Sequence, residues 1–421
     1  MHDHTTVRVE ERRSRARGAL RWIALLLLCM AALVAEADAA TRTFAHPGLL
    51  HSAQDLARIR EKLTLSAAPW QAGWERLIAN PHASLDWKPR PVEIVYRGYD
   101  GQHPENYTLL YRDAAAAYAL ALRWKLGGDS RYADKAVEIM NAWSGKLTAI
   151  RGTSDAALAA GIYGYEFANA GELMRDYTGW NRDDFNHFKQ MMLDVFYPIN
   201  HDFLARHNNA QIDHYWANWD LAQLNAILAI GVLTDRADLY DEAIDYFKHG
   251  AGNGSVAKAI WKLYPAQGMG QVQESGRDQG HATLVIALLG SLCQMAWSQG
   301  DDLFGYDDNR VLKGAEYVAA YNVCDTDGDR CDDTLALPYT PYSNSDVTQT
   351  TLSPNGRGTL RPEWELLYNH YVVLKGLKAP YLTRFAAKVR AEGGGGDYGP
   401  NSGGYDQLGY GTLLYSLQQT P

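Results

Sequence analysis

The sequence predicts an all-α fold: an α/α toroid, which is an incomplete barrel of helical hairpins, in one large domain. Apolar residues recur at helical spacing along almost the whole chain after residue 50. The segments between these stretches are a few residues long, which favours hairpins of neighbouring helices. Strand-like alternation is sparse, so an α/β fold with a parallel sheet is not expected. Helices with one apolar face stack into a ring, and their inner ends surround a cleft.

The first predicted helix spans 52–63. Ser52 stands three positions before Asp55, as in a capping box, and Leu56 and Ile59 fall on one face. The later predicted helices span 107–126, 132–147, 156–174, 181–199, 214–233, 237–251, 281–299, 309–323, 361–377 and 380–390. The clearest strand signal lies at 91–98.

The N-terminus predicts export. Residues 8–21 carry six arginines, and an uninterrupted apolar run follows at 22–35. The run is too short to cross a bilayer comfortably, and the small residues at 37–39 form an A-x-A cleavage site. We therefore expect residues 1–39 to be a signal peptide. Residues 40–421 would then be a periplasmic or secreted toroid domain, without a membrane anchor after cleavage.

The formal net charge of −9 excludes two classes of partner. No basic surface dominates, so neither nucleic acid nor an anionic membrane is an expected partner. An anionic polysaccharide would have to be bound by a local cluster of cations. The composition does not indicate an oligomeric state.

The sequence contains no motif for a cofactor or for a catalytic metal. The acidic turn Asp325–Asp329 is either a solvated turn or a structural calcium site. Cys324 and Cys331 bracket this turn, and in an exported protein they are either bonded to each other or free. Cys293 lies in an apolar helix and is predicted to be a small buried side chain.

Aromatic residues suggest what enters the cleft. The chain has 12 tryptophans and 26 tyrosines, and several stand beside amides, as in "HYWANWDLAQLN" at 214–225. Flat aromatic faces with neighbouring amides suit the apolar C–H faces and hydroxyl edges of sugar rings. The alternative is that these aromatic side chains are simply part of the core.

A second stretch, "GQVQESGRDQGH" at 270–281, gathers charge where an apolar helix begins. Glu274, Arg277 and His281 are spaced three and four apart, so on a helix they would lie close to one face. The glycine-rich approach would let a ligand come near the backbone. The alternative is a surface or capping ion pair in which Glu274 only holds Arg277 and favours the positive end of the helix.

These motifs together resemble a family. "NNAQIDHYWANWDL" at 208–221, followed by the E-x-x-R element, resembles the alginate lyase superfamily. The run from "HPGLLHS" through "FYPIN", "AGNGS", "QESGRDQGH", "RPEWELLYNHY" and "EGGGGDYGPNSGGYDQLGYGTL" most resembles polysaccharide lyase family 38. This resemblance implies an α/α toroid and β-elimination on 1,4-linked uronans such as alginate or glucuronan.

The chemistry then assigns roles. A uronate lyase must neutralise the carboxylate at C5, remove the C5 proton and protonate the departing O4. The resemblance implies Arg277 and Asn208 as neutralisers, with Gln273 in support. The sequence departs from the superfamily pattern, because Ala210 stands where a histidine is expected and Leu284 where a tyrosine is expected. The candidates for proton transfer are His214, Tyr215, His281 and Tyr368. The candidates for substrate binding are Trp216, Trp219, Gln273, Glu274, Arg361 and His370.

Two other functions are compatible with the sequence. A glycoside hydrolase on an α/α barrel would need two carboxylates across the sugar, for which Asp213, Asp220 and Glu274 are available. A sugar-binding protein without catalysis would need the aromatic residues but not the Glu, Arg and His group. Ultraviolet absorbance separates these functions, because only elimination creates a conjugated double bond.

Overall fold

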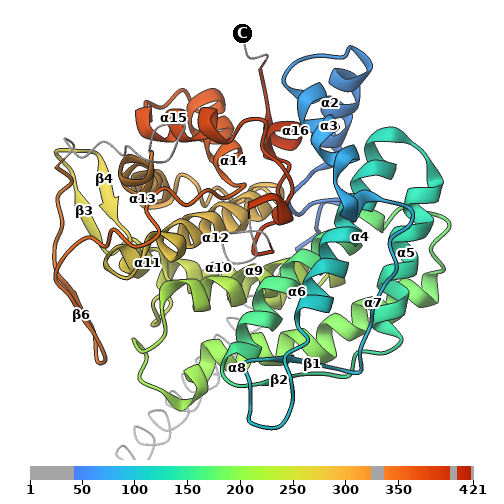
Figure 1. The fold of residues 1–421 in the computed structure, drawn as a ribbon, viewed down its shortest axis with the longest axis horizontal. Coiled ribbons are helices and arrows are strands. Elements are labelled where there is room, and N and C mark those ends of the chain that lie inside the picture. Colours follow the sequence, from blue (N-terminus) through green and yellow to red (C-terminus); the bar gives the residue numbers. More distant parts are fainter. Residues whose placement is uncertain (1–41, 324–335, 399–404, 419–421) are drawn as a thin grey trace, which may run out of the picture. The chain divides into compact units, whose positions relative to one another are not determined.

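The inner helices of the fold lie side by side and form one wall of a ring (Figure 1). The computed structural model describes residues 42–323, 336–398 and 405–418. Of the inner helices, α4 (Thr108–Gly127) packs on α6 (Asp155–Met174), α6 on α9 (Ala217–Thr234), and α9 on α12 (Gln279–Trp297). The outer helices α5 (Ser130–Ser144), α10 (Ala237–His249) and α13 (Tyr306–Asn322) pack on α4, α9 and α12, while α7 (Arg182–Met191) packs on α5.

The two ends of the domain close the ring. The helix α14 (Trp364–Tyr368) contacts α12, α15 (Pro380–Val389) and α16 (Gly411–Tyr415). The N-terminal helices α2 (Ala53–Thr64) and α3 (Trp70–Ala79) then contact both α16 and α4. This closed succession of inner and outer helices is an α/α toroid, as the sequence predicts.

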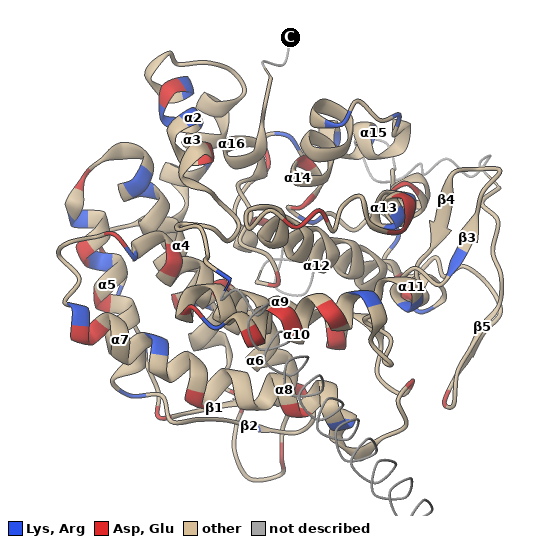
Figure 2. Cartoon of the chain, turned by 180° about the vertical axis from the view of Figure 1, so that it is seen from behind, with Lys and Arg blue, Asp and Glu red and all other residues tan. Residues whose placement is uncertain are grey.

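Inner and outer helices differ in composition because they differ in burial. The helix α12 carries no Asp, Glu, Lys or Arg (Figure 2). In α9, Asp220 is the one residue of these four types. Both helices are buried on nearly all sides. The outer helix α5 is amphipathic and buries one stripe that includes Ile139 and Trp143. At the contact between α6 and α9, a Cβ on Gly161 would lie 2.8 Å from the backbone of Ala222, so only glycine permits this approach.

Three short strand pairs connect the helices. The strands β1 (Ile94–Arg97) and β2 (Ala149–Gly152) pair in parallel, with Arg97 opposite Gly152. The strands β3 (Lys262–Tyr264) and β4 (Met269–Gln271) form an antiparallel hairpin, as do β5 (Tyr342–Ser343) and β6 (Thr348–Gln349). The remaining short elements are η1 (Pro81–Ala83), η2 (Met192–Phe196), α8 (Tyr197–Arg206), η3 (His207–Asn209), α11 (Val256–Ala259), η4 (Gln273–Gly276), η5 (Asn369–Leu374) and η6 (Gly395–Tyr398).

Most predicted elements agree with the structure. The capping box of Ser52 and Asp55 is present at α2, the strand β1 lies within 91–98, and Cys293 is buried. The helix α3 was not predicted, because its indole-rich sequence around Trp70 lacks a clear start signal. The predicted helix 361–377 is wrong in length: α14 is five residues long and continues as the π-helical segment η5. The signal peptide, Cys324, Cys331 and the acidic turn lie outside the described residues.

Candidate active site

The segment η4 caps a helix from a distant part of the chain. The backbone N–H of Ala217 donates to Oε1 of Gln273 at 3.0 Å. The backbone N–H and the side-chain amide of Asn218 donate to Oε1 of Glu274 at 3.0 and 2.7 Å. Trp216, the residue before α9, makes no side-chain cap of its own. Gln273 and Glu274 therefore satisfy the first N–H groups of α9, and the Glu274 carboxylate lies at the positive end of that helix.

Arg277 is held by the same carboxylate. Its Nη1 donates to Oε2 of Glu274 at 2.9 Å, and its guanidinium lies over the Trp216 ring at 5.0 Å. Its Nε lies 3.6 Å from Oδ2 of Asp278. The side chain is 27% exposed, while that of Glu274 is buried. Within the described residues no hydrogen bond involves Nη2 of Arg277, so one edge of the guanidinium keeps its donors for a ligand.

His281 is oriented by Asp278, which is the N-cap of α12. Asp278 accepts hydrogen bonds from the backbone N–H of His281 at 2.8 Å and from its ring Nδ1 at 2.7 Å. Burial favours a higher pKa for Asp278, but the hydrogen bond from His281 and the charge of Arg277 lower that pKa on balance. An ionised carboxylate only accepts, so Nδ1 carries the proton and Nε2 of a neutral ring keeps its lone pair. The same oxygen, Oδ2, contacts both Arg277 and His281.

His281 lines a cavity of about 310 Å³. Its other lining residues come mainly from the N-terminal parts of the inner helices and from β1: Arg97, Tyr107, Tyr111, Leu158, Ile162, Tyr163, Asn218, Leu284, Arg361, Tyr405 and Asp406. The cavity thus combines cations with tyrosine hydroxyls and ring faces. Burial raises the pKa of Tyr111, and burial also raises that of Tyr163 well above its usual value, so both hydroxyls stay protonated and can donate.

Comparison with known proteins identifies the family. The family model "Alginate lyase" matches residues 69–328. The chain belongs to the alginate lyase family. It is therefore a polysaccharide lyase, and no curated relative matches its sequence.

Solved structures show the same fold. An alginate lyase from Bacteroides ovatus matches with a TM-score of 0.59 and 15% identity, over 89% of this chain and 100% of that one. Alginate lyase A1-III from Sphingomonas species A1 matches with a TM-score of 0.55 and 14% identity, over 86% of this chain and 95% of that one. A variant of A1-III complexed with a tetrasaccharide matches with a TM-score of 0.55 and 15% identity, over 87% of this chain and 95% of that one. These matches support the α/α toroid.

Three sequence expectations about the 270–281 stretch of this lyase are corrected. Arg277 and His281 do not share a face of one helix, because α12 begins at Gln279 and Arg277 precedes it. They are brought together by Asp278 instead. Gln273 is not free for substrate, because it is 1% exposed and its amide also donates to the hydroxyl of Tyr342. Glu274 is 0% exposed, so it positions Arg277 and does not reach a ligand.

Arg361 lines the cavity, but its donors are used inside the protein. It is 2% exposed and donates to Asp406 at 2.9 Å and to Gln407 at 3.2 Å. Its other nitrogens donate to the carbonyl of Gly280 and to the hydroxyl of Thr283. Arg361 thus fastens the 405–407 segment to the start of α12. The expected direct contact with substrate is corrected to a positioning role.

Asn208 and Tyr215 lie beside a second cavity of the lyase. Asn208 donates to the Tyr215 hydroxyl at 3.0 Å and lines a cavity of about 350 Å³ with Phe203 and Asp202. Tyr215 and Trp219 pack together with ring centroids 4.8 Å apart, and both pack on Phe203. Neither Asn208 nor Tyr215 lines the cavity that contains His281.

Three further candidates lie away from that cavity. Nδ1 of His214 forms a hydrogen bond with Oδ2 of Asp346 at 2.7 Å, in the loop of the β5–β6 hairpin. His370 is 5% exposed and stacks on Phe304 at 3.7 Å, and burial lowers its pKa to about 4. Tyr368 lies under the guanidinium of Arg390 at 5.5 Å. The expected roles of His370 and Tyr368 are corrected, because neither side chain lines the cavity that contains His281: Tyr368 ends α14, and His370 lies in the following segment η5.

The acids proposed for a hydrolase do not face each other. Asp220 is 0% exposed and accepts hydrogen bonds from Tyr246 at 2.9 Å and from Gly254 at 3.0 Å. Asp213 binds Ser345 at 2.8 Å in the loop of the β5–β6 hairpin. The acid that lines the cavity is Asp406, which is paired with Arg361. Within the described lining of this cavity, Asp406 has no opposed second carboxylate of the kind that glycoside hydrolysis needs.

Sequence reasoning missed several residues of the site. Asp278 had a usable signal, because an aspartate three positions before His281 at the start of an apolar run is a typical N-cap. Asn218 and Arg97 had none, because their places depend on contacts with Glu274 and Tyr163.

Proposed function

We propose that this lyase cleaves 1,4-linked uronans by β-elimination, with His281 as the base and Arg277 as the carboxylate neutraliser. One observation carries the proposal: Asp278 holds Nδ1 of His281 at 2.7 Å and contacts Arg277, so a basic Nε2 and a guanidinium with unused donors lie together beside a cationic, tyrosine-lined cavity. A base needs a lone pair near the proton that it removes, and an enolate needs a nearby positive charge.

These groups account for each proton that moves and each bond that forms or breaks in the reaction. Arg277 binds the carboxylate at C5, and its hydrogen bonds strengthen as charge spreads onto that carboxylate. His281 takes the C5 proton through Nε2. The electron pair forms the C4=C5 double bond, and the bond from C4 to the glycosidic oxygen breaks. That oxygen takes a proton from a cavity tyrosine such as Tyr111, whose raised pKa keeps its hydroxyl protonated.

Charge and the relatives support a uronan as the substrate class. The related structures are named as alginate lyases, and one of them holds a tetrasaccharide. For this chain we propose a uronan, either alginate or glucuronan, and membership of polysaccharide lyase family 38. An anionic sugar chain suits a cavity whose lining includes Arg97 and His281, and tyrosine rings suit its sugar faces.

Product chemistry tests the proposal. The purified protein is mixed with mannuronate-rich alginate, guluronate-rich alginate or glucuronan, and ultraviolet absorbance and reducing ends are recorded together. Elimination raises both signals in equal molar amounts. New reducing ends without absorbance would show hydrolysis, and no product from any uronan would refute this function.

We also propose that the protein acts outside the cytoplasm. The arginine-rich segment 8–21, the apolar run 22–35 and the A-x-A site at 37–39 support a mature N-terminus near Ala40. N-terminal sequencing of exported protein should therefore begin at or next to this residue. An exported form that keeps the arginine-rich segment would contradict the assignment.

A further inference from the structure

Arg97 is a cation of the cavity that forms no salt bridge within the described residues, although the charges of Asp406 and Asp155 act on it from a longer distance. It ends β1, and its guanidinium lies over the ring of Tyr107 at 5.0 Å and over that of Tyr163 at 5.5 Å. In the described part of the chain its one hydrogen bond runs from Nη1 to the Tyr163 hydroxyl at 3.0 Å. The side chain is half-buried and lines the same cavity as His281. Two tyrosines therefore fix the plane of this guanidinium, and most of its N–H donors are unused.

The local backbone holds Arg97 in place. The strand β1 pairs in parallel with β2, and Gly152 lies opposite Arg97 with a φ of +128°. A Cβ on Gly152 would lie 2.0 Å from the carbonyl oxygen of Arg97, so the strands can meet here only at a glycine. The arginine is thus set by backbone and ring contacts before any ligand arrives, which lowers the entropic cost of binding one.

Comparison with the other arginines that line or border the cavity shows what Arg97 lacks. Arg361 donates hydrogen bonds to Asp406, to Gln407 and to the backbone carbonyl of Gly280. Arg277 is paired with Glu274 at 2.9 Å through Nη1 and keeps Nη2 for a ligand. Among the described residues Arg97 donates only to the Tyr163 hydroxyl, which stays neutral because burial raises the pKa of Tyr163 well above its usual value, and the charges of Asp406 and Asp155 act on Arg97 without a salt bridge. A partly buried guanidinium that forms no internal salt bridge binds a planar carboxylate well, because two parallel N–H···O bonds can form.

We infer that Arg97, clamped between Tyr107 and Tyr163, binds the carboxylate of a second uronate, adjacent to the one that reacts. This inference rests on the proposed function. Arg277 and His281 meet at Asp278 at the start of α12, whereas Arg97 belongs to the wall made by β1, α4 and α6. Two separate cations with unused donors can each bind one carboxylate of a sugar chain. The lyase therefore selects sugar chains in which uronates follow one another over chains in which the neighbouring sugar is neutral.

The test compares Arg97→Gln with Arg151→Gln on a homopolymeric uronan. Arg151 lies on β2 next to Gly152 but is exposed and does not line the cavity, so it is a matched control. Arg97→Gln should raise KM roughly tenfold to a hundredfold, as the loss of a charge-assisted hydrogen bond does, with a smaller change in kcat. Arg151→Gln should behave as the wild type. An unchanged KM in a folded Arg97→Gln variant would overturn the inference.

A second substrate keeps this test separate from the proposed function. Partial reduction of the uronan carboxyl groups to alcohols lowers the number of adjacent uronates. The wild type should lose efficiency on this material, while Arg97→Gln should discriminate at least about fivefold less between the two substrates. Equal discrimination by both proteins would contradict the role of Arg97.

Titration calorimetry measures binding directly and therefore tests Arg97 even if the protein shows no lyase activity. If the wild type makes no double bond, the proposed function fails, and titration with a uronate tetrasaccharide still tests Arg97. Binding to the wild type that is lost in Arg97→Gln would support a carboxylate site, and equal binding would refute it. If Arg97→Gln does not fold, Arg97→Lys keeps the charge without the planar fork, and the same rise in KM is expected in weaker form.

Discussion

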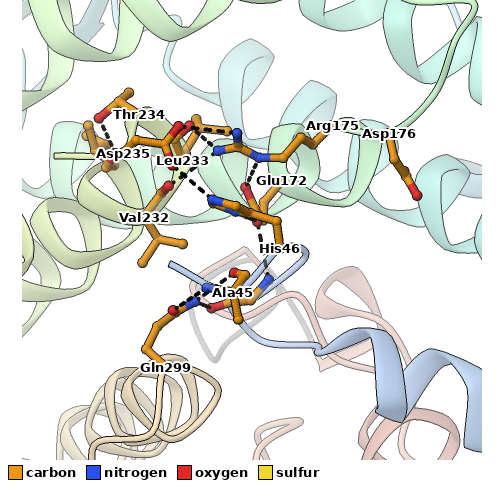
Figure 3. A network of polar contacts seen from close by, with 12 residues as sticks. Ala45, His46, Glu172, Arg175, Asp176, Val232, Leu233, Thr234, Asp235 and Gln299 are labelled. Atoms are coloured by element: carbon orange, nitrogen blue, oxygen red, sulfur yellow. Dashed lines mark hydrogen bonds and ion pairs between the residues drawn. The ribbon is translucent and has the colours of Figure 1, made fainter. Parts of the chain in front are cut away.

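Two ionic networks of this lyase use the same four kinds of side chain for different purposes. The N-terminal clasp consists of His46, Glu172, Arg175 and Asp235 (Figure 3). The cleft network consists of Glu274, Arg277, Asp278 and His281. Each has one arginine, one histidine, one glutamate and one aspartate. The two networks differ in how many ring and guanidinium nitrogens have no partner within the protein.

The N-terminal clasp is closed. His46 contacts Glu172 through Nδ1 at 2.5 Å and Asp235 through Nε2 at 2.9 Å. Arg175 bonds Glu172 at 3.0 Å and Asp235 at 3.3 Å, and its Nη2 donates to backbone carbonyls of 232 and 233 (Figure 3). Every ring or guanidinium nitrogen thus has a partner. The clasp holds the segment after Phe44 against the C-terminal ends of α6 and α9, so its role is stability.

The cleft network is open. His281 uses Nδ1 on Asp278, and no bond to its Nε2 is found within the described residues. Arg277 keeps Nη2, and both side chains are partly exposed, at 27% and 38%. Residue types and spacing do not distinguish the two networks. The two networks are distinguished by how many ring and guanidinium nitrogens have no partner in the protein and by their exposure. This criterion separates stability from catalysis in the variants below.

The largest expected effect is on turnover. His281→Ala should lower kcat by about 10²–10⁴, the range for loss of a general base, with little change in melting temperature. The matched change His46→Ala should leave kcat within about twofold and lower the melting temperature. Ultraviolet assays and thermal melts on both variants make the comparison. A folded His281→Ala enzyme with normal turnover would assign His281 to structure.

A smaller effect on turnover is expected when Asp278, the residue that orients His281, is changed. Asp278→Asn keeps an N-cap for α12 but removes the charge that fixes the tautomer of His281. Turnover should fall about tenfold, since positioning groups contribute less than the base itself. The melting temperature should change little at neutral pH. Equal losses in Asp278→Asn and His281→Ala would instead show that Asp278 takes part in proton transfer directly.

The smallest effect is on stability and depends on pH. Burial favours a lower pKa for His46, but hydrogen bonds and charges from Glu172 and Asp235 raise that pKa above 6.5 on balance. The stabilisation is therefore fully present below pH 6.5 and is lost as pH rises through the folded-state pKa. His46→Gln should cost about 1–2 kcal/mol of unfolding free energy at pH 6 and less at pH 9. A cost that grows with pH would contradict the clasp.

Sequence patterns predicted what depends on local periodicity and caps. The inner helices carry long apolar stretches, and Ser52 with Asp55 shows its capping box in the sequence itself. Contacts between distant segments could not be predicted in this way. Glu274 caps Asn218, which lies 56 positions earlier, and no spacing rule connects them. For the same reason Glu274 looked like a ligand-binding acid, whereas it anchors a helix.

Arg97 and His370 show the two errors that follow from this. Arg97 lies in the cavity but was not predicted there, and His370 was predicted there but lies elsewhere. The strand at 91–98 was predicted, but its parallel partner β2 lies beyond two helices, so nothing local placed Arg97 in the cavity. His370 follows an aromatic run and resembled a cleft residue, yet it lies in η5 and stacks on Phe304 between α12 and α13. The patterns indicate which segments are helical, while packing decides which side chains meet.

Arginine-to-lysine changes in the two networks test the central claim most directly. Lysine keeps the charge but loses the planar fork, so Arg277→Lys should lower kcat roughly tenfold to a hundredfold while the protein melts as the wild type does. Arg175→Lys should lose about 1–3 kcal/mol of stability and keep its turnover. Both quantities are measured on both variants with the same uronan. An Arg277→Lys enzyme that is stable and fully active would contradict the role of Arg277 in neutralising the substrate carboxylate.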